Sequence, residues 1–211
     1  MNENDSNLIE RFKPVDRANH WLTAITFILA ALSGLALFHP AFFWLSNLLG
    51  GGTWTRILHP FIGVVLAVSF GFLAHRFYAD NRITEADREW VRHFRDVVTN
   101  HDERLPEVGR FNAGQKYLFW IMVATVALLL ASGIVIWQPW FAPWFSIGFT
   151  RVAAVIHALV AFVLIAGIIV HIYAAFWVKG TIQGMTRGTV TRAWARYHHP
   201  GWYREVTKGM K

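Results

Sequence analysis

Two histidines, His157 and His171, lie fourteen residues apart within the uncharged run Val152–Val178. On an α-helix, about 100° of rotation per residue brings them to within about 40° of the same face. A rise of about 1.5 Å per residue separates them by roughly 21 Å along the axis. Because an imidazole inside a bilayer is costly, it indicates a function, and this spacing would suit axial ligands of two stacked haems. The alternative is two polar residues that hydrogen-bond across a helix interface.

The composition indicates which elements would hold such ligands. Of the 211 residues, 55% are hydrophobic, and four stretches contain no Asp, Glu, Lys or Arg over about 18 residues or more, enough to span a bilayer. Lipid offers the backbone no hydrogen-bond partner, so these stretches should be helices. We predict an all-α fold, an integral membrane four-helix bundle in a single domain over residues 1–211. Its spans are expected at about 21–38, 57–77, 115–137 and 150–178, followed by a cytoplasmic tail over 179–211.

Basic residues are concentrated in alternate connecting segments. Three Lys and Arg precede residue 21, eight lie from Arg76 to Lys116 and seven follow Val178, whereas the other two connections hold only Arg56 and Arg151. By the positive-inside rule, both termini and the middle loop face the cytoplasm. Basic residues that flank membrane spans give little support to nucleic-acid binding. No cleavage motif of a signal peptide is evident, so we expect the N-terminus to be retained.

The chain contains no cysteine. This excludes all-cysteine iron–sulfur clusters, covalently attached c-type haem and disulfides within the chain. If the protein carries electrons, histidine-ligated haem is the main cofactor that it could bind.

The predicted topology sorts four histidines by depth. His20 lies at the cytoplasmic mouth of the first helix, and His59 lies near the outer start of the second. The fourth helix runs from outside to inside, so His157 is outer and His171 is inner. Depth therefore pairs His59 with His157 and His20 with His171. Each pair joins two different helices, as bis-histidine ligation of a haem iron requires.

Other histidines are competing candidates. His39, at the outer end of the first helix, could replace His59 as a ligand. His75 follows His59 by sixteen residues, about 160° around a helix, so the two cannot share a face. We expect the histidines of the polar segments to be solvated: His93, His101, His198 and His199.

Glycines inside the predicted spans would let a flat macrocycle or another backbone approach closely. They are Gly34, Gly63, Gly71, Gly133 and Gly167. Simple helix packing explains any single one of them equally well. Near the outer level, the cation Arg56 could pair with a haem propionate or reach lipid phosphates.

A polar motif precedes the third predicted helix, where Arg110–Lys116 reads Arg-Phe-Asn-Ala-Gly-Gln-Lys. Asn112 and Gln115 offer neutral donors and acceptors near the cytoplasmic surface, beside a helix N-terminus. Such groups would suit a quinone carbonyl close to His171. From the local chemistry alone, helix capping with Asn112 as N-cap is favoured.

The connecting segments are predicted more coarsely. Loop 39–56 should be a turn at the membrane surface, and the aromatic loop 138–151 an interfacial belt or a docking surface. A short helix is expected around Glu85–Val98. The basic tail from Lys179 should lie on the membrane face or against a neighbouring loop. No internal repeat is evident.

Six motifs together carry a resemblance to a known family. They are Asp16-Arg17-Ala18-Asn19-His20-Trp21, Arg56-Ile57-Leu58-His59-Pro60-Phe61, Phe111-Asn112-Ala113-Gly114-Gln115-Lys116, Ser132-Gly133-Ile134-Val135-Ile136-Trp137, Phe176-Trp177-Val178-Lys179-Gly180 and His198-His199-Pro200-Gly201-Trp202-Tyr203-Arg204-Glu205. From Phe12 on, the chain resembles the cytochrome b556 (gamma) subunits of respiratory, membrane-bound formate dehydrogenases. It departs from them mainly in residues 1–10 and around Asp80–Glu107, where no proposed ligand lies.

The resemblance implies two haem b groups. His20 and His171 would ligate the inner haem iron, and His59 and His157 the outer one, which are the pairs that depth also gives.

The resemblance further implies a quinone site on the cytoplasmic side, at Asn112, Gly114 and Gln115 next to His171. This reverses the local preference for capping. The quinone would be menaquinone or ubiquinone, and this chain would hold no residue that oxidises formate.

Partners and location follow in the same way. Formate would be oxidised in a molybdenum or tungsten catalytic (alpha) subunit outside the membrane. Electrons would pass through an iron–sulfur (beta) subunit to the outer haem, the inner haem and quinone, in anaerobic respiration. The complex is expected to lie in the bacterial inner membrane and to assemble as a trimer of heterotrimers.

Two alternatives remain open. The chain could be the cytochrome b subunit of a nickel–iron hydrogenase or thiosulfate reductase, since such di-haem anchors share four helices. It could also be a haem-free membrane anchor or small transporter with buried histidines. A bound chromophore would distinguish the cytochrome b subunits from a haem-free anchor or transporter.

Overall fold

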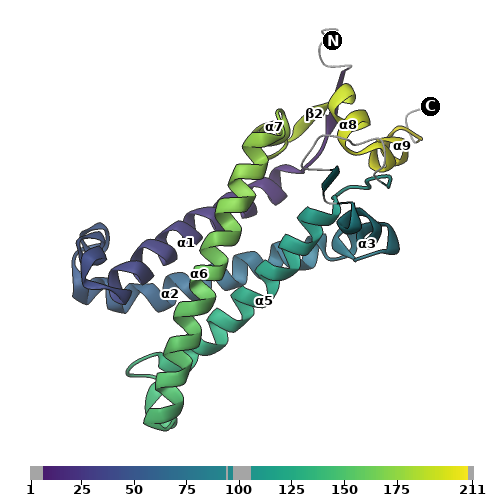
Figure 1. Cartoon of the computed structure of the whole chain (residues 1–211). Coiled ribbons are helices and arrows are strands. Elements are labelled where there is room, and N and C mark those ends of the chain that lie inside the picture. The colour runs from purple at the N-terminus through teal and green to yellow at the C-terminus, as the bar shows by residue number, and fades with distance from the viewer. Residues whose placement is uncertain (1–6, 94, 97–105, 209–211) are drawn as a thin grey trace. The chain divides into compact units, whose positions relative to one another are not determined.

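Four long apolar helices dominate the structure (Figure 1), a computed structural model that describes residues 7–93, 95, 96 and 106–208. They are α1 (Pro14–Phe38), α2 (Gly52–Phe77), α5 (Ala113–Ile136) and α6 (Ile147–Trp177). All four are long and apolar enough to cross a membrane, which confirms the prediction of four spans. Each begins before the predicted span, because residues that precede that span are themselves helical; Asp16 and Arg17, for example, lie in the first turn of α1.

Two 3-10 helices lie in the connections that the sequence analysis describes as loops 39–56 and 138–151. They are η2 (Pro40–Leu49), between α1 and α2, and η5 (Ala142–Trp144), between α5 and α6. His39 is the N-cap of η2, where its Nδ1 accepts a hydrogen bond from the backbone N–H of Ala41 at 3.2 Å. The histidine considered as a substitute ligand thus has a local capping role.

The helices contribute to two compact units. One comprises Ala18–His75 and Ile121–Val170, which contain most of the four long helices; we call it the helical unit. The other comprises the described residues of Met1–Arg17, Arg76–Trp120 and His171–Lys211; we call it the terminal unit. Within the terminal unit, α3 (Glu85–Arg92) is the predicted short helix. Residues 97 and 98 of that prediction lie outside the described chain.

The terminal unit is built around a two-stranded antiparallel sheet that joins the two ends of the chain. Strand β1 (Leu8–Glu10) pairs with β2 (Thr189–Thr191), and Ile9 lies opposite Val190. The helices α7 (Thr181–Thr186), α8 (Arg192–His198) and α9 (Pro200–Lys208) flank β2 along the chain (Figure 1). Ile9, Val190, Ala195 and Trp202 form its buried core. The tail therefore packs on the N-terminal segment.

A buried arginine fastens this core to the loop that precedes α5. The guanidinium of Arg11 lies 4.3 Å from the ring centre of Trp202 and donates a hydrogen bond to the carbonyl of Arg110. Arg110 in return donates to the carbonyl of Arg11 at 3.0 Å, and its guanidinium pairs with Asp80 at 3.4 Å. Buried charges need partners of this kind, so the loop is held to the segment around Arg11 and to α9.

Gly188 forms the turn between α7 and β2. Its φ is 86°, in the left-handed region, and a Cβ there would approach the carbonyl oxygen of Phe12 to 3.0 Å. Glycine adopts this positive φ without strain and has no Cβ to meet the carbonyl.

The expectation that His199 is solvated is wrong. Its side chain is only 4% exposed, because α9 folds back onto the loop before α5, where Gly201 N–H donates to the carbonyl of Val108 at 3.0 Å. Nδ1 of His199 lies 2.9 Å from the carbonyl oxygen of Gly109. A carbonyl only accepts, so Nδ1 carries the proton. Burial and then the charge of Arg11 lower the pKa of His199 to about 3.

This buried imidazole predicts a loss of stability in acid. Unfolded histidine has a pKa of about 6.5, so between that pH and pH 3 only the unfolded chain binds the proton. The neutral, buried imidazole therefore makes its full contribution to the free energy of unfolding above about pH 6.5. This free energy falls as the pH falls, by about 2 kcal/mol at pH 5. Thermal unfolding of the purified protein at pH 7 and pH 5 measures it. His199→Gln, which keeps an N–H donor, should lose less stability between the two pH values; an equal loss would contradict the assignment.

Candidate functional site

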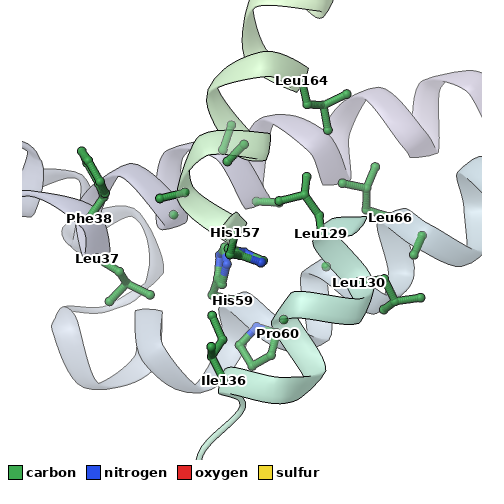
Figure 2. Close-up of a pocket in the computed structure, with 18 of the residues that line it drawn as sticks. Leu37, Phe38, His59, Pro60, Leu66, Leu129, Leu130, Ile136, His157 and Leu164 are labelled. Carbon is green, nitrogen blue, oxygen red and sulfur yellow. The ribbon is translucent and has the colours of Figure 1, made fainter. Parts of the chain in front are cut away.

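A cavity of about 520 Å³ lies inside the helical unit, lined by all four long helices. Two of the predicted ligands reach it: His59 from α2 and His157 from α6. Figure 2 shows the two imidazoles close together on the cavity wall, with apolar side chains such as Leu129 and Ile136 around them. Cavities of roughly 300–1,000 Å³ with few polar groups are typical of cofactor sites.

The separation of these imidazoles suits a shared metal ion. Their ring centres are 6.3 Å apart and their planes are 77° apart. When two imidazole nitrogens bind the same metal ion from opposite sides at about 2 Å, the two ring centres lie about 6 Å apart. Within the described residues no group of three His, Cys, Asp or Glu side chains could hold a metal ion. A porphyrin supplies its own four nitrogens, so a haem needs only two axial ligands from the protein.

Each of the two histidines contacts a serine–glycine pair on a neighbouring helix. Ser33 Oγ on α1 lies 2.8 Å from His59 Nδ1, and Ser132 Oγ on α5 lies 3.0 Å from His157 Nδ1. The next residue in each case is a glycine, at which a Cβ would lie 3.3 Å from Cε1 of the same ring. The serine contacts involve only Nδ1, so Nε2 is the nitrogen that can ligate iron.

The remaining lining fits an amphipathic macrocycle. Besides the histidines it is mostly aliphatic, with Gly34, Gly63 and Gly133 among the lining residues. One cation, Arg56 on α2, lies on the lining and would suit an anionic propionate. Of the other histidines in the described chain, neither His39 nor His75 lines this cavity.

The histidines predicted as the inner pair belong to different units. His20 lies on α1 in the helical unit, where Asn19 Nδ2 donates to the carbonyl of Ser69 on α2 at 3.0 Å. Thr23 adds a hydroxyl contact to Ser69 at 3.2 Å, so α1 and α2 are tied together near His20. His171 lies on α6 in the terminal unit and is exposed. The pairing of His20 with His171 stays a prediction.

The polar motif before α5 forms a reciprocal helix cap. Asn112 Oδ1 accepts from the backbone N–H of Gln115 at 2.9 Å, and Gln115 Oε1 accepts from the backbone N–H of Asn112 at 3.0 Å. This is the pattern of a capping box, as the local chemistry indicates. Both bonds use the amide oxygens, which leaves the amide N–H groups as the donors that a quinone carbonyl would meet. Gly114 and Gln115 are exposed, and the quinone role of this turn stays a prediction.

A buried ion pair holds α3 against this turn. Lys116 Nζ lies 2.7 Å from Asp87 Oδ2, and both side chains are largely buried. Burial alone would raise the pKa of Asp87, but hydrogen bonds from Lys116 and Thr84 outweigh it and keep that pKa below its usual value. Trp90 of α3 packs beside Gly114, where a Cβ would lie 3.5 Å from the indole ring. The turn is therefore rigidly supported.

The sequence analysis did not identify several of these residues. The Thr84–Asp87 capping box was readable from its spacing. The ion pair of Lys116 with Asp87 could not be read from the sequence, because twenty-nine residues separate the two. Ser33 and Ser132 are each followed by glycine, and this doublet was a signal that the sequence offered for them.

The known proteins to which this chain is similar are b-type cytochromes. Residues 11–188 match the family described as prokaryotic cytochrome b561. The chain is 49% identical over 200 residues to the cytochrome b556(fdo) subunit of formate dehydrogenase from Escherichia coli strain K12, covering 95% of this chain and 94% of that protein. It is 42% identical to the nitrate-inducible cytochrome b556(Fdn) subunit of the same strain, covering 96% and 94%. The cytochrome b556 subunit of formate dehydrogenase from Haemophilus influenzae is 39% identical, covering 96% and 84%.

Proposed function

Because the chain belongs to the family of cytochrome b556 subunits of formate dehydrogenases, we propose that it conducts electrons through two haem b groups to quinone. His59 and His157 ligate the outer haem, and His20 and His171 the inner one. Asn112, Gly114, Gln115 and His171 form the quinone site.

The convergence of His59 and His157 in one apolar cavity is the observation that carries the proposal. Their ring-centre separation of 6.3 Å and their glycine-flanked lining fit an axially ligated haem. Haem b bound there supplies a one-electron couple within the membrane. The aliphatic lining keeps water from the iron ligands, and Arg56 offers a counter-charge to a propionate. Nε2 of each histidine would be the atom that binds the iron, because Nδ1 contacts a serine.

At the other end of α6, the chain's residues would bind the electron acceptor. Asn112 and Gln115 present amide N–H donors at the start of α5, where the helix dipole favours negative charge on a reduced quinone oxygen. The ion pair of Lys116 with Asp87 keeps this turn in place. Protonation of the reduced quinone from the cytoplasm, with electrons supplied from outside, separates charge across the membrane. Each elementary charge moved stores about 2.3 kcal/mol per 100 mV.

The orientation and partners complete the proposal. Both termini and the connection between α2 and α5 face the cytoplasm, as the distribution of Lys and Arg indicates. The connections that contain η2 and η5 face outward and meet an iron–sulfur subunit. That subunit passes on electrons from formate, which a molybdenum or tungsten subunit oxidises. The complex lies in the bacterial inner membrane as a trimer of heterotrimers.

A haem count tests the proposed function directly. The protein is purified in detergent, and a dithionite-reduced minus oxidised spectrum is recorded together with a pyridine haemochrome assay. Two b-type haems per chain are expected. One haem would mean that one ligand pair is wrong. None, in folded protein supplied with haem, would leave a haem-free membrane anchor.

Gln115→Leu is expected to leave both haem spectra intact and to slow quinol formation, because it removes the amide donor from the quinone site. The measurement is formate-dependent reduction of a soluble quinone analogue by the purified complex.

Gln115→Glu separates a quinone contact from helix capping. A glutamate keeps the oxygen that accepts from the Asn112 N–H but has no N–H to donate. Impaired quinone reduction in both variants supports the quinone site. Normal kinetics in the Glu variant and impairment only in the Leu variant would assign Gln115 to capping alone.

A further inference from the structure

The contacts of His59 and His157 with serine are the same arrangement built twice. Ser33 on α1 contacts His59 on α2, and Ser132 on α5 contacts His157 on α6. Both serines are buried. Two helix pairs that are far apart in sequence thus use the same side chain at the same ring atom, Nδ1.

The direction of each hydrogen bond follows from the serine. Ser33 Oγ lies 2.6 Å from the carbonyl oxygen of Leu29, and Ser132 Oγ lies 2.6 Å from that of Leu128. A carbonyl cannot donate, so the single hydroxyl proton lies in this bond. The serine oxygen must then accept from the imidazole. Nδ1 therefore carries a proton in both rings, and Nε2 keeps the lone pair that a metal ion needs.

The glycine after each serine fixes how close the ring approaches its helix. A Cβ at residue 34 or residue 133 would lie 3.3 Å from Cε1 of the neighbouring imidazole, which is tighter than ordinary van der Waals contact. Glycine therefore lets the ring lie against the helix while the serine holds Nδ1. Serine and glycine together restrain the position and the rotation of each imidazole.

The arrangement is marked in the sequence by a short repeat. Residues 26–34 read Thr-Phe-Ile-Leu-Ala-Ala-Leu-Ser-Gly, and residues 125–133 read Thr-Val-Ala-Leu-Leu-Leu-Ala-Ser-Gly. The threonines, Thr26 and Thr125, are buried and donate to the carbonyl four residues earlier, as the serines do. The two segments are identical at four of nine positions, namely the threonine, one leucine, the serine and the glycine.

We propose that Ser33 and Ser132 are a matched pair of positioning residues for the outer haem, which rests on the proposed function of His59 and His157 as its ligands. Each serine fixes the tautomer and the orientation of its histidine. By accepting the Nδ1 proton it also raises the basicity of the ligand. More basic ligands favour ferric over ferrous iron, so the pair lowers the potential of the outer haem and favours transfer of its electron inward.

The test is a redox titration of the purified complex, followed at the haem absorption bands, in the wild type, Ser33→Ala, Ser132→Ala and the double variant. The potential of the outer haem is expected to rise in each single variant and further in the double variant. A tenfold shift of the outer haem's ferric–ferrous equilibrium toward the ferrous state corresponds to a rise in potential of about 59 mV for one electron. The low-spin ferric EPR signal of that haem should shift as well, since it responds to the orientation of the two imidazoles.

The repeat supplies matched controls. Thr26→Ala and Thr125→Ala each remove a buried hydroxyl that donates to the backbone carbonyl four residues earlier, as the serines do, at a position seven residues before the serine. Both should leave the potential and the EPR signal unchanged.

The outcomes separate this proposal from the one on which it rests. If both haems are present but the serine variants titrate like the wild type, the serines only pack and the proposal is overturned. If serine and threonine variants lose haem equally, the effect is general destabilisation and the proposal is again overturned. Selective weakening of haem retention in the serine variants, by about 10–100-fold, supports it. A wild type without haem would overturn the proposed function itself.

Discussion

His157→Ala is expected to reduce the haem content from two per chain to one and to abolish electron transfer from formate to quinone. The variant leaves His59 as the one histidine on the cavity lining among the described residues. It also leaves the hydroxyl of Ser132 without its imidazole. Loss of an outer-shell partner alone typically costs about 10–100-fold in metal affinity or activity, so loss of a ligand should cost more than about 100-fold.

The haem that remains in His157→Ala should respond to dithionite but not to formate, because the point of electron entry is lost. The pyridine haemochrome assay and a formate-reduced spectrum measure the two effects. His39→Ala is the matched control, since His39 is also a histidine of the outer end but caps η2 and does not line the cavity. Two haems in His157→Ala would refute the ligand assignment. One haem in the His39 variant would indicate that His39 is a ligand.

His171→Ala is expected to remove the other haem and to stop quinone reduction as well. The outer haem should still be reduced by formate, and it should stay reduced when quinone is added. This is the opposite of the His157 result, in which formate reduces nothing. The two variants therefore order the haems along the path. The measurement is the haem spectrum after formate and then after a quinone analogue.

A control for His171→Ala is His75→Ala, which replaces an exposed histidine near the end of α2. It should behave as the wild type in haem content and in quinone reduction. Re-oxidation of the outer haem by quinone at the normal rate in His171→Ala would mean that neither the inner haem nor the quinone site depends on His171.

The four helices were predictable because length and hydropathy are local properties of the sequence. Charge distribution then gave relative depths, and depth matched His59 with His157, which the structure brings within 6.3 Å between ring centres. Their role as ligands stays a prediction, as does the pairing of His20 with His171. The predicted helices began too late, since residues that precede the uncharged runs, such as Asp16 and Arg17 of α1, were placed outside the helices.

The contacts that the sequence did not reveal are long-range. The burial of His199 depends on a carbonyl ninety residues away, that of Gly109. Strands β1 and β2 have three residues each, too few for a period-two pattern to emerge. Ser33 and Ser132 lie within apolar runs, where a hydroxyl ordinarily bonds to its own helix. They do so here, and the second contact, to a histidine, requires the neighbouring helix.

The pairing of Ile9 with Val190 also has a consequence for biogenesis. Strand β1 leaves the ribosome well before its partner strand β2 and Trp202, which follow the sequences of all four long helices. Until then the strand has open backbone groups, which are prone to wrong pairing, and Arg11 lacks its aromatic partner. The two strands can therefore pair only after translation has passed β2. A chain that terminates before residue 189 would retain an unpaired N-terminal strand, available to chaperones and proteases.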